Sequence, residues 1–203
     1  IAYATKTDPV EAISTNSDIF TIAFQIPGAQ PKQITADKGA DSGPQYSPDG
    51  KCLSWRSQQR AGFEADKWTL TLLNRTTGVR KAVAGDFDRS IDGWVWTPDS
   101  KAIYLTVGED GGGHVYRVEL AGGAPRLILK DGSNGDVQVS ADGRRLVFTR
   151  QSLTAPAEIY LATAEGAGAT PATTVNADML APFGLKRGES ITYDGAGGTK
   201  VQA

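Results

Sequence analysis

The sequence has little of what most catalytic and metal sites are built from. It contains one cysteine, Cys52, one histidine, His114, and one methionine among 203 residues. A lone cysteine excludes an internal disulfide, and a lone histidine leaves few ways to build a metal site or a nucleophile–base pair. We therefore expect no metal, no cofactor and no catalytic residue in this chain.

Long apolar runs and an excess of charge of one sign are also missing. Hydrophobic residues make up 39% of the chain, and no apolar run approaches the ~18 residues that a membrane-spanning helix requires. The 21 lysines and arginines nearly balance the 23 aspartates and glutamates, which gives a net charge of −2. Such a balance offers no electrostatic basis for binding a polyanion, so we expect neither a nucleic acid nor a membrane as a partner.

Glycine and proline, by contrast, are abundant. The 24 glycines and 10 prolines make up about 17% of the chain, against a usual ~12%, which indicates many turns. Residues 1–5 form an apolar, β-prone run that has neither an initiator methionine nor the features of a signal peptide. We therefore expect the chain to be part of a longer protein.

A short turn motif recurs three times. Residues 46–55, 96–105 and 139–148 each contain a β-prone run, a four-residue turn around an aspartate, a cationic residue and a second β-prone run. Proline presets the backbone at the second turn position, and glycine supplies a positive φ where it occurs. Each of the three segments therefore predicts a two-stranded hairpin.

The spacing of these motifs indicates larger repeats. Asp99 follows Asp49 by 50 residues and Asp142 follows Asp99 by 43, and further β-prone runs with glycine turns recur in phase. Each period thus holds four short strands, and no segment shows helical periodicity. A four-stranded antiparallel unit of ~40–50 residues in tandem is typical of a β-propeller blade. A β-sandwich, the alternative, gives similar turn spacing without requiring the motif to return once every four strands.

We therefore predict an all-β fold, a partial β-propeller of about three and a half four-stranded antiparallel blades. The predicted parts are an incomplete blade at 1–40, whole blades at 41–86, 87–132 and 133–178, and a segment after the propeller at 182–203, so that the propeller part covers 1–181. A closed ring has about four to eight blades. Open blade edges are therefore expected to pair with the remaining blades or with a second copy of the chain.

Two motifs resemble catalytic or metal sites, but each has a simpler explanation. No Gly-x-Ser-x-Gly nucleophile elbow accompanies His114 anywhere in the chain, so we expect a surface or blade-edge histidine. Residues 86–92 carry aspartates at the spacing of a calcium loop. However, Ile91 and Thr97 stand where such a loop needs glycine and glutamate. We expect an inter-blade loop whose carboxylates cap turns and pair with Arg89.

The connection at residues 57–67 is longer than a hairpin needs, and it mixes an aromatic residue with charges of both signs. Long loops on rigid scaffolds often carry function, although a solvated excursion is the alternative. The candidate binding residues in this loop are Glu64 and Asp66, followed by Arg60.

Several of these segments together resemble a known family. The similar segments are 47–51 (SPDGK), 60–68 (RAGFEADKW), 87–90 (FDRS) and 96–105 (WTPDSKAIYL). They resemble the propeller domain of bacterial prolyl oligopeptidase-family serine peptidases, most of all the acylaminoacyl-peptidase and dipeptidyl-peptidase V branch. The turn motif also occurs in TolB-type propellers, whereas the long loop combined with Phe-Asp-Arg-Ser is more specific.

The C-terminal residues extend this resemblance. Residues 182–185 and 189–202 are similar to the first strand pair of the α/β-hydrolase domain that follows the propeller in the family. The resemblance implies that the catalytic serine, aspartate and histidine lie further downstream than Ala203. No catalytic residue of the family is therefore carried over to this chain.

The resemblance implies a substrate-gating propeller portion of a serine peptidase that cleaves short peptides, of the acylaminoacyl or dipeptidyl type. Such a portion is non-catalytic on its own, and Glu64, Asp66 and Arg60 are candidate contacts to a charged peptide end. The implied partners are the remaining blades and the hydrolase domain of the same protein, together with the oligopeptide substrate. The alternative is a TolB-like propeller that scaffolds a protein partner. Bacterial periplasm and cytoplasm both stay open, because a single cysteine fits either.

Overall fold

The computed structural model describes residues 1–10 and 13–203, which are almost entirely short strands and turns. By its contacts the chain divides into two compact units. The first comprises residues 1–92, 99–102 and 118–125, and the second comprises 93–98, 103–117 and 126–203. In the described part of the chain, no helix is long and apolar enough to cross a membrane.

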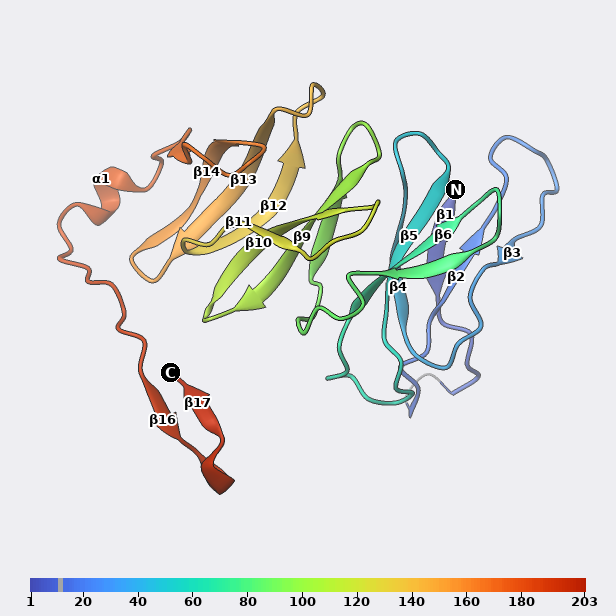
Figure 1. Cartoon of the computed structure of the whole chain (residues 1–203), viewed down its shortest axis with the longest axis horizontal. Helices are drawn as coiled ribbons and strands as arrows, with labels where there is room; N and C mark the ends of the chain where they lie inside the picture. Colours follow the sequence, from blue (N-terminus) through green and yellow to red (C-terminus); the bar gives the residue numbers. More distant parts are fainter. Residues whose placement is uncertain (11–12) are drawn as a thin grey trace. The chain divides into compact units, whose positions relative to one another are not determined.

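The first unit contains two antiparallel sheets (Figure 1). The three-stranded sheet has the order β1 (Ala2–Thr5), β2 (Asp18–Thr21), β3 (Lys32–Gln33). The four-stranded sheet has the order β4 (Asp41–Tyr46), β5 (Cys52–Ser57), β6 (Thr69–Asn74), β7 (Arg80–Val83). The second sheet is one complete unit of four strands joined as successive hairpins, as the repeat predicts.

Two further strand sets follow in chain order. One comprises β8 (Gly93–Trp96), β9 (Ala102–Glu109), β10 (Gly112–Glu119) and β11 (Arg126–Leu129). The other comprises β12 (Ser133–Val139), β13 (Arg145–Ser152), β14 (Ala155–Thr163) and β15 (Thr170–Pro171). Within each set, the pairing is antiparallel along the described registers, and a single parallel pair, Gly113 with Ser133, joins β10 to β12.

The predicted turn motif forms a hydrogen-bonded turn between β4 and β5. Ser47 Oγ accepts the N–H of Cys52 at 2.9 Å and donates to Asp49 Oδ1 at 2.6 Å, and Asp49 Oδ1 also accepts the N–H of Lys51 at 3.0 Å. Gly50 has φ +70, in the left-handed region where a residue without Cβ is favoured. These contacts of the serine and the aspartate fix the register of the hairpin.

Each unit has an apolar core on its strands. In the first unit, Ile19, Leu53 and Trp55 are at most 1% exposed and form one cluster. In the second unit, the cluster is made by inward residues of β9 to β14: Tyr104, Val115, Ile128, Leu129, Val137, Leu146, Phe148 and Ala162. The hydroxyl of Tyr104 donates to the carbonyl of Ala164 at 2.8 Å, which satisfies the one polar atom of this side chain.

After β15 the chain forms the short helix α1 (Ala177–Leu180) and a C-terminal hairpin. The hairpin pairs β16 (Thr192–Asp194) with β17 (Lys200–Gln202) in antiparallel register. The strand pair predicted within residues 189–202 is therefore present, and its assignment to a hydrolase domain stays a prediction.

Candidate functional site

The long connection predicted at residues 57–67 joins β5 to β6, between Ser57 and Thr69. Ser57 and Thr69 are register partners, so a tight turn would be enough to join these two strands. The chain instead makes an excursion, whereas the corresponding connection between β9 and β10 consists of Asp110 and Gly111 alone. The excursion is therefore an addition to the blade, which does not need it to close the hairpin.

Gln58 holds the base of this loop. Its side chain is 5% exposed, and Nε2 donates to the carbonyl oxygens of Glu64 at 2.9 Å and Asp66 at 2.7 Å. Its backbone N–H donates to Ala40 O at 2.8 Å. A Cβ on Gly39 would lie 1.8 Å from the carbonyl oxygen of Gln58, so only glycine fits there. The loop is thus anchored to the blade by a buried amide that the sequence interpretation missed.

Asp66, one of the predicted contact residues, braces the loop from within. Its Oδ2 accepts the backbone N–H groups of Arg60 and Gln59, each at 2.8 Å. These backbone hydrogen bonds lower the pKa of Asp66, because they favour the ionised carboxylate. The structure therefore gives Asp66 a positioning contact, and its predicted contact with a ligand stays a prediction.

Arg60 and Glu64, the other two predicted residues, lie exposed on the same loop. The guanidinium of Arg60 lies 4.0 Å from the centre of the Phe63 ring, and that ring is 40% exposed. Among the described residues, the Glu64 carboxylate forms no hydrogen bond or ion pair. Gly62 N donates to Thr15 Oγ1 at 3.0 Å, which ties the loop tip to a neighbouring connection. The loop therefore presents an anion and a cation-covered aromatic ring to solvent.

The loop is also joined to the segment that carries Phe-Asp-Arg-Ser. Lys67 Nζ donates to Phe87 O at 3.2 Å, and Trp68 N donates to Ser90 Oγ at 3.1 Å. The guanidinium of Arg56 lies 4.5 Å from the Trp68 ring centre. The two segments whose joint occurrence made the resemblance specific are therefore in direct contact.

Within residues 86–92, the predicted pairing with Arg89 is confirmed for one carboxylate. Arg89 NH1 lies 4.0 Å from Asp88 Oδ2, and both side chains are exposed. Among the described residues, no group of three or more histidine, cysteine, aspartate or glutamate side chains is placed to hold a metal ion.

The prediction of a surface or blade-edge histidine is wrong. His114 is 4% exposed within β10, and its Nδ1 lies 3.2 Å from Glu109 Oε2, which also accepts the hydroxyl of Tyr116. Gly112 and Gly113, which precede it, belong to the same strand and allow close approach of Gly132 and Asn134. His114 and Tyr116 thus share the Glu109 carboxylate as a hydrogen-bond partner within one hairpin.

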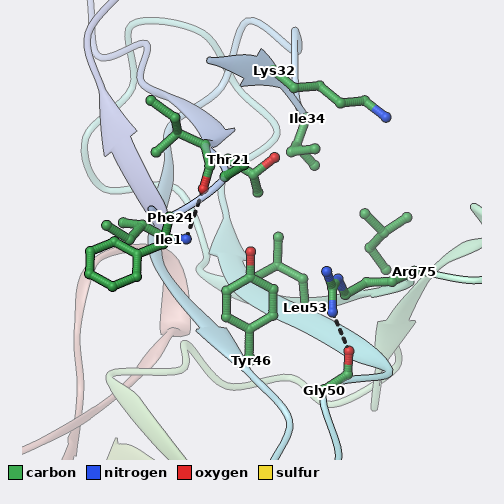
Figure 2. Close-up of a pocket in the computed structure, with 12 residues that line it drawn as sticks. Ile1, Thr21, Phe24, Lys32, Ile34, Tyr46, Gly50, Leu53 and Arg75 are labelled. Carbon is green, nitrogen blue, oxygen red and sulfur yellow. Dashed lines mark hydrogen bonds between the residues drawn. The ribbon is translucent and has the colours of Figure 1, made fainter. Parts of the chain in front are cut away.

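A cavity of about 630 Å³ in the first unit contains none of the three predicted residues (Figure 2). It is lined by apolar side chains such as Leu53 and Leu73 and by the cations Lys32 and Arg75. The guanidinium of Arg75 donates to Gly50 O and lies 4.8 Å from the Tyr46 ring centre, so this cation already has partners.

Comparisons with known proteins show the class to which this fold belongs. No protein-family model matches the chain. TolB from Acinetobacter baumannii superposes with a TM-score of 0.65 at 21% identity, over 86% of this chain and 41% of that one. Pyrococcus horikoshii acylaminoacyl peptidase gives 0.67 at 17% identity, over 93% of this chain and 28% of that one. These likenesses confirm the class predicted from the repeats, an all-β partial β-propeller.

Sequence relatives narrow the class further. The chain is 30% identical to dipeptidyl-peptidase 5 of Porphyromonas gingivalis over 201 residues, and 34% identical to dipeptidyl-peptidase 5 of Porphyromonas endodontalis over 203 residues. These matches cover 96% and 99% of this chain but 29% of each relative. The predicted resemblance to a peptidase-family propeller fragment is confirmed: over nearly its whole length the chain is similar to a part of proteins named dipeptidyl-peptidase 5.

Proposed function

We propose that the chain is the substrate-gating propeller portion of a serine peptidase that cleaves short peptides, of the acylaminoacyl or dipeptidyl type, and that it is non-catalytic on its own. The observation that carries this proposal is the exposed Glu64 carboxylate on a braced loop, in a chain whose relatives are named dipeptidyl-peptidase. The remaining blades and the hydrolase domain of the same protein are the proposed partners.

The chemistry of the substrate favours a carboxylate at this place. An enzyme that releases dipeptides has to locate the free N-terminus of its substrate, which is an ammonium group at neutral pH. A carboxylate held in a fixed position is a natural acceptor for that group, because a charge-assisted hydrogen bond is about twice as strong as a neutral one. Glu64 supplies the carboxylate, while Gln58 and Asp66 hold the backbone that carries it.

The two residues best suited to nucleophilic chemistry support a non-catalytic role. His114 is buried beside Glu109. Burial raises the pKa of the Cys52 thiol, which lowers its thiolate fraction at neutral pH. We expect the isolated chain to hydrolyse neither peptides nor esters, and turnover by a purified sample would contradict this part of the proposal.

The test compares Glu64→Gln with Glu165→Gln in the full-length protein. Glu165 is an exposed glutamate in the turn after β14, so its substitution removes the same charge away from the loop. The substrates are a peptide with a free N-terminal amine and its N-acylated counterpart. We expect Glu64→Gln to lower kcat/KM about 10- to 100-fold for the free amine, the range of one charged hydrogen bond.

With the acylated peptide, Glu64→Gln should behave like the parent, and Glu165→Gln should behave like the parent with both peptides. An equal effect of Glu64→Gln on the two peptides would contradict the role of this carboxylate. The TolB-like alternative, a propeller that scaffolds a protein partner, predicts that the full-length protein hydrolyses neither peptide.

A further inference from the structure

Strand β1 lies at the edge of its sheet. It pairs with β2 on one side, and no strand in the described part of the chain pairs with its other side. Ile1 and Ile22 exchange two backbone hydrogen bonds, of 2.9 and 3.0 Å. Because the pairing alternates along an antiparallel strand, the backbone groups of Ala2 and Ala4 point away from β2. This side of β1 therefore offers unpaired backbone groups to a further strand.

The sheet of β1, β2 and β3 has the same internal contacts as strands β13, β14 and β15. Tyr3 and its register partner Phe20 stack with their ring centres 5.8 Å apart, and Phe148 and its register partner Tyr160 stack at 5.9 Å. Strand β1 is therefore the equivalent of β13. Both sides of β13 are paired, one with β14 and the other with β12.

The exposure of Ile1 differs from that of its equivalents. Ile1 and Leu146 each lie two residues before the stacked aromatic residue of their strand, and Leu53 takes the same place in β5. Leu146 and Leu53 are at most 1% exposed, whereas Ile1 is 58% exposed. In the two complete hairpins, the residue before the turn is the register partner at this place: Tyr46 for Leu53 and Val139 for Leu146. A strand equivalent to β12 would therefore cover Ile1.

The turns of neighbouring hairpins contact each other. Asp49 N donates to Ser100 Oγ at 3.0 Å, and a Cβ on Gly143 would lie 3.9 Å from Pro98 Cδ. Gly50 holds the position of Ser100 and Gly143 in the first turn of the chain. It lines the cavity of about 630 Å³, together with the start of β1 (Figure 2). The cavity thus lies where a preceding turn lies in the other two pairs.

The lining of this cavity suits such a turn. All three turns of the chain contain an aspartate, and the cations Lys32 and Arg75 line the cavity. Arg75 donates to Gly50 O and keeps further N–H donors, because a guanidinium has five. Leu53 and Leu73 add apolar surface for the residue before the turn. Charge and polarity are therefore complementary to an acidic turn that follows an apolar strand.

We propose that β1 and this cavity bind a strand and its turn of the Ser/Thr-x-Asp-Gly kind, contributed by the part of the full-length protein that precedes residue 1. The strand pairs antiparallel with β1, and its last residue before the turn covers Ile1. The turn fills the cavity beside Gly50. Only the assignment of the partner to the same protein rests on the proposed function, which includes the remaining blades.

The first experiment measures amide hydrogen exchange in the full-length protein. Val147 and Thr149 are the built-in controls, because they occupy in β13 the places of Ala2 and Ala4 and are register partners of β12 residues. We expect the amides of Ala2 and Ala4 to exchange as slowly as those of Val147 and Thr149. In the 203-residue chain, the amides of Ala2 and Ala4 should exchange at least about 100-fold faster, while the two control amides stay slow.

The second experiment compares Ile1→Ala with Ile26→Ala in the full-length protein. The two isoleucines are 58% and 61% exposed, and Ile26 lies in the connection between β2 and β3. If the proposed strand covers Ile1, Ile1→Ala removes buried methyl groups and should lower the thermal unfolding midpoint of the propeller by roughly 5–10 °C. Ile26→Ala should leave the midpoint unchanged.

Three results would overturn the proposal. One is fast exchange of the Ala2 and Ala4 amides in the full-length protein while the amides of Val147 and Thr149 are slow. Another is an equal change of the midpoint in the two isoleucine variants. The third is slow exchange of Ala2 and Ala4 in the 203-residue chain that depends on protein concentration, because the partner would then be a second copy. If the strand is present but Glu64→Gln does not change the kinetics, only the proposed function fails.

Discussion

The two ends of the blade strands differ in how much they repeat. At one end, the turns between β4 and β5 and between β12 and β13 make the same contacts. The serine donates to the aspartate at 2.6 Å in both turns, and it accepts a backbone N–H at 2.9 Å in one and 3.0 Å in the other. At the opposite end, the connection after β5 spans residues 58–68, whereas the one after β9 has two residues.

This difference distinguishes the turn residues, which stabilise the fold, from the residues of the long connection, which differ from one blade to the next. The repeated turn fixes the register of a hairpin, and all three turns keep an aspartate with a serine or threonine two residues before it. The long connection closes a hairpin that a tight turn would also close, and it carries exposed charge on an anchored backbone. Substitutions at the first end should therefore act on stability, and substitutions at the second end on substrate selection.

Replacing residues 58–68 with the dipeptide Asp-Gly gives the largest expected effect. The full-length variant should fold, because Ser57 and Thr69 remain register partners. Its kcat/KM for peptides with a free N-terminus should fall roughly 100-fold, through loss of a charged, positioned contact. Steady-state kinetics gives the ratio of kcat/KM for free-amine peptides to kcat/KM for acylated peptides. If a folded variant keeps the parent's ratio, the loop end of the strands does not act on substrate selection.

Ser47→Ala and Thr15→Ala remove one hydroxyl at each end. Ser47 is 3% exposed, and its loss leaves the N–H of Cys52 without an acceptor. The free energy of unfolding should fall by about 1–2 kcal/mol. Thr15 accepts the exposed N–H of Gly62, which water can satisfy, so denaturant unfolding of Thr15→Ala should match that of the parent. An equal loss of unfolding free energy in Ser47→Ala and Thr15→Ala would contradict the claim that only the turn end determines stability.

Gly50→Ala and Gly62→Ala form a pair matched in backbone geometry. Both glycines have φ +70 and room for a Cβ, so each substitution introduces about 1 kcal/mol of left-handed strain. In both variants this strain should lower the free energy of unfolding of the protein by a similar amount. Gly62→Ala should in addition lower kcat/KM for free-amine peptides, because Gly62 lies in the loop that carries Glu64, whereas Gly50→Ala should leave kcat/KM unchanged. A lower kcat/KM in Gly50→Ala together with an unchanged one in Gly62→Ala would contradict the assignment of substrate selection to this loop.

The smallest expected effect is a change in folding stability at low pH. Hydrogen bonds from Ser140 and from the N–H of Arg144 lower the pKa of Asp142, and those from Ser47 and the N–H of Lys51 lower that of Asp49. A lowered pKa contributes stability above the unfolded pKa, near 4, and that stability is lost as the pH falls through the folded pKa. Asp142→Asn should therefore flatten the acid side of the unfolding profile. A profile that keeps the parent's slope would contradict this assignment.

The turn end could be predicted from sequence because its chemistry is local. Asp49 and Asp142 contact residues within two positions, so the motif itself specifies the contacts. Position 100 shows the limit of the rule: Ser100 takes φ 59 where the other two turns have glycine, and its Oγ accepts the N–H of Asp49. The fold was thus predicted from repeats that require only short-range information.

The loop end was predicted only in part, because its contacts join residues that are distant in the sequence or concern backbone atoms. Charge and loop length pointed to Glu64 and Asp66, but only the structure shows that Asp66 binds the backbone of Arg60. Gln58 carries no pattern that marks it as an anchor. The burial of His114 and of Asp41 depends on packing of strands from different hairpins, which no local motif reports.

The most direct test of the central claim is the position of a substrate's N-terminal nitrogen in a structure of the full-length protein with a bound peptide. We predict that this nitrogen lies about 3 Å from a carboxylate oxygen of Glu64, at hydrogen-bond distance. A peptide whose N-terminal nitrogen is held by other groups, with residues 58–67 out of contact with it, would contradict the account.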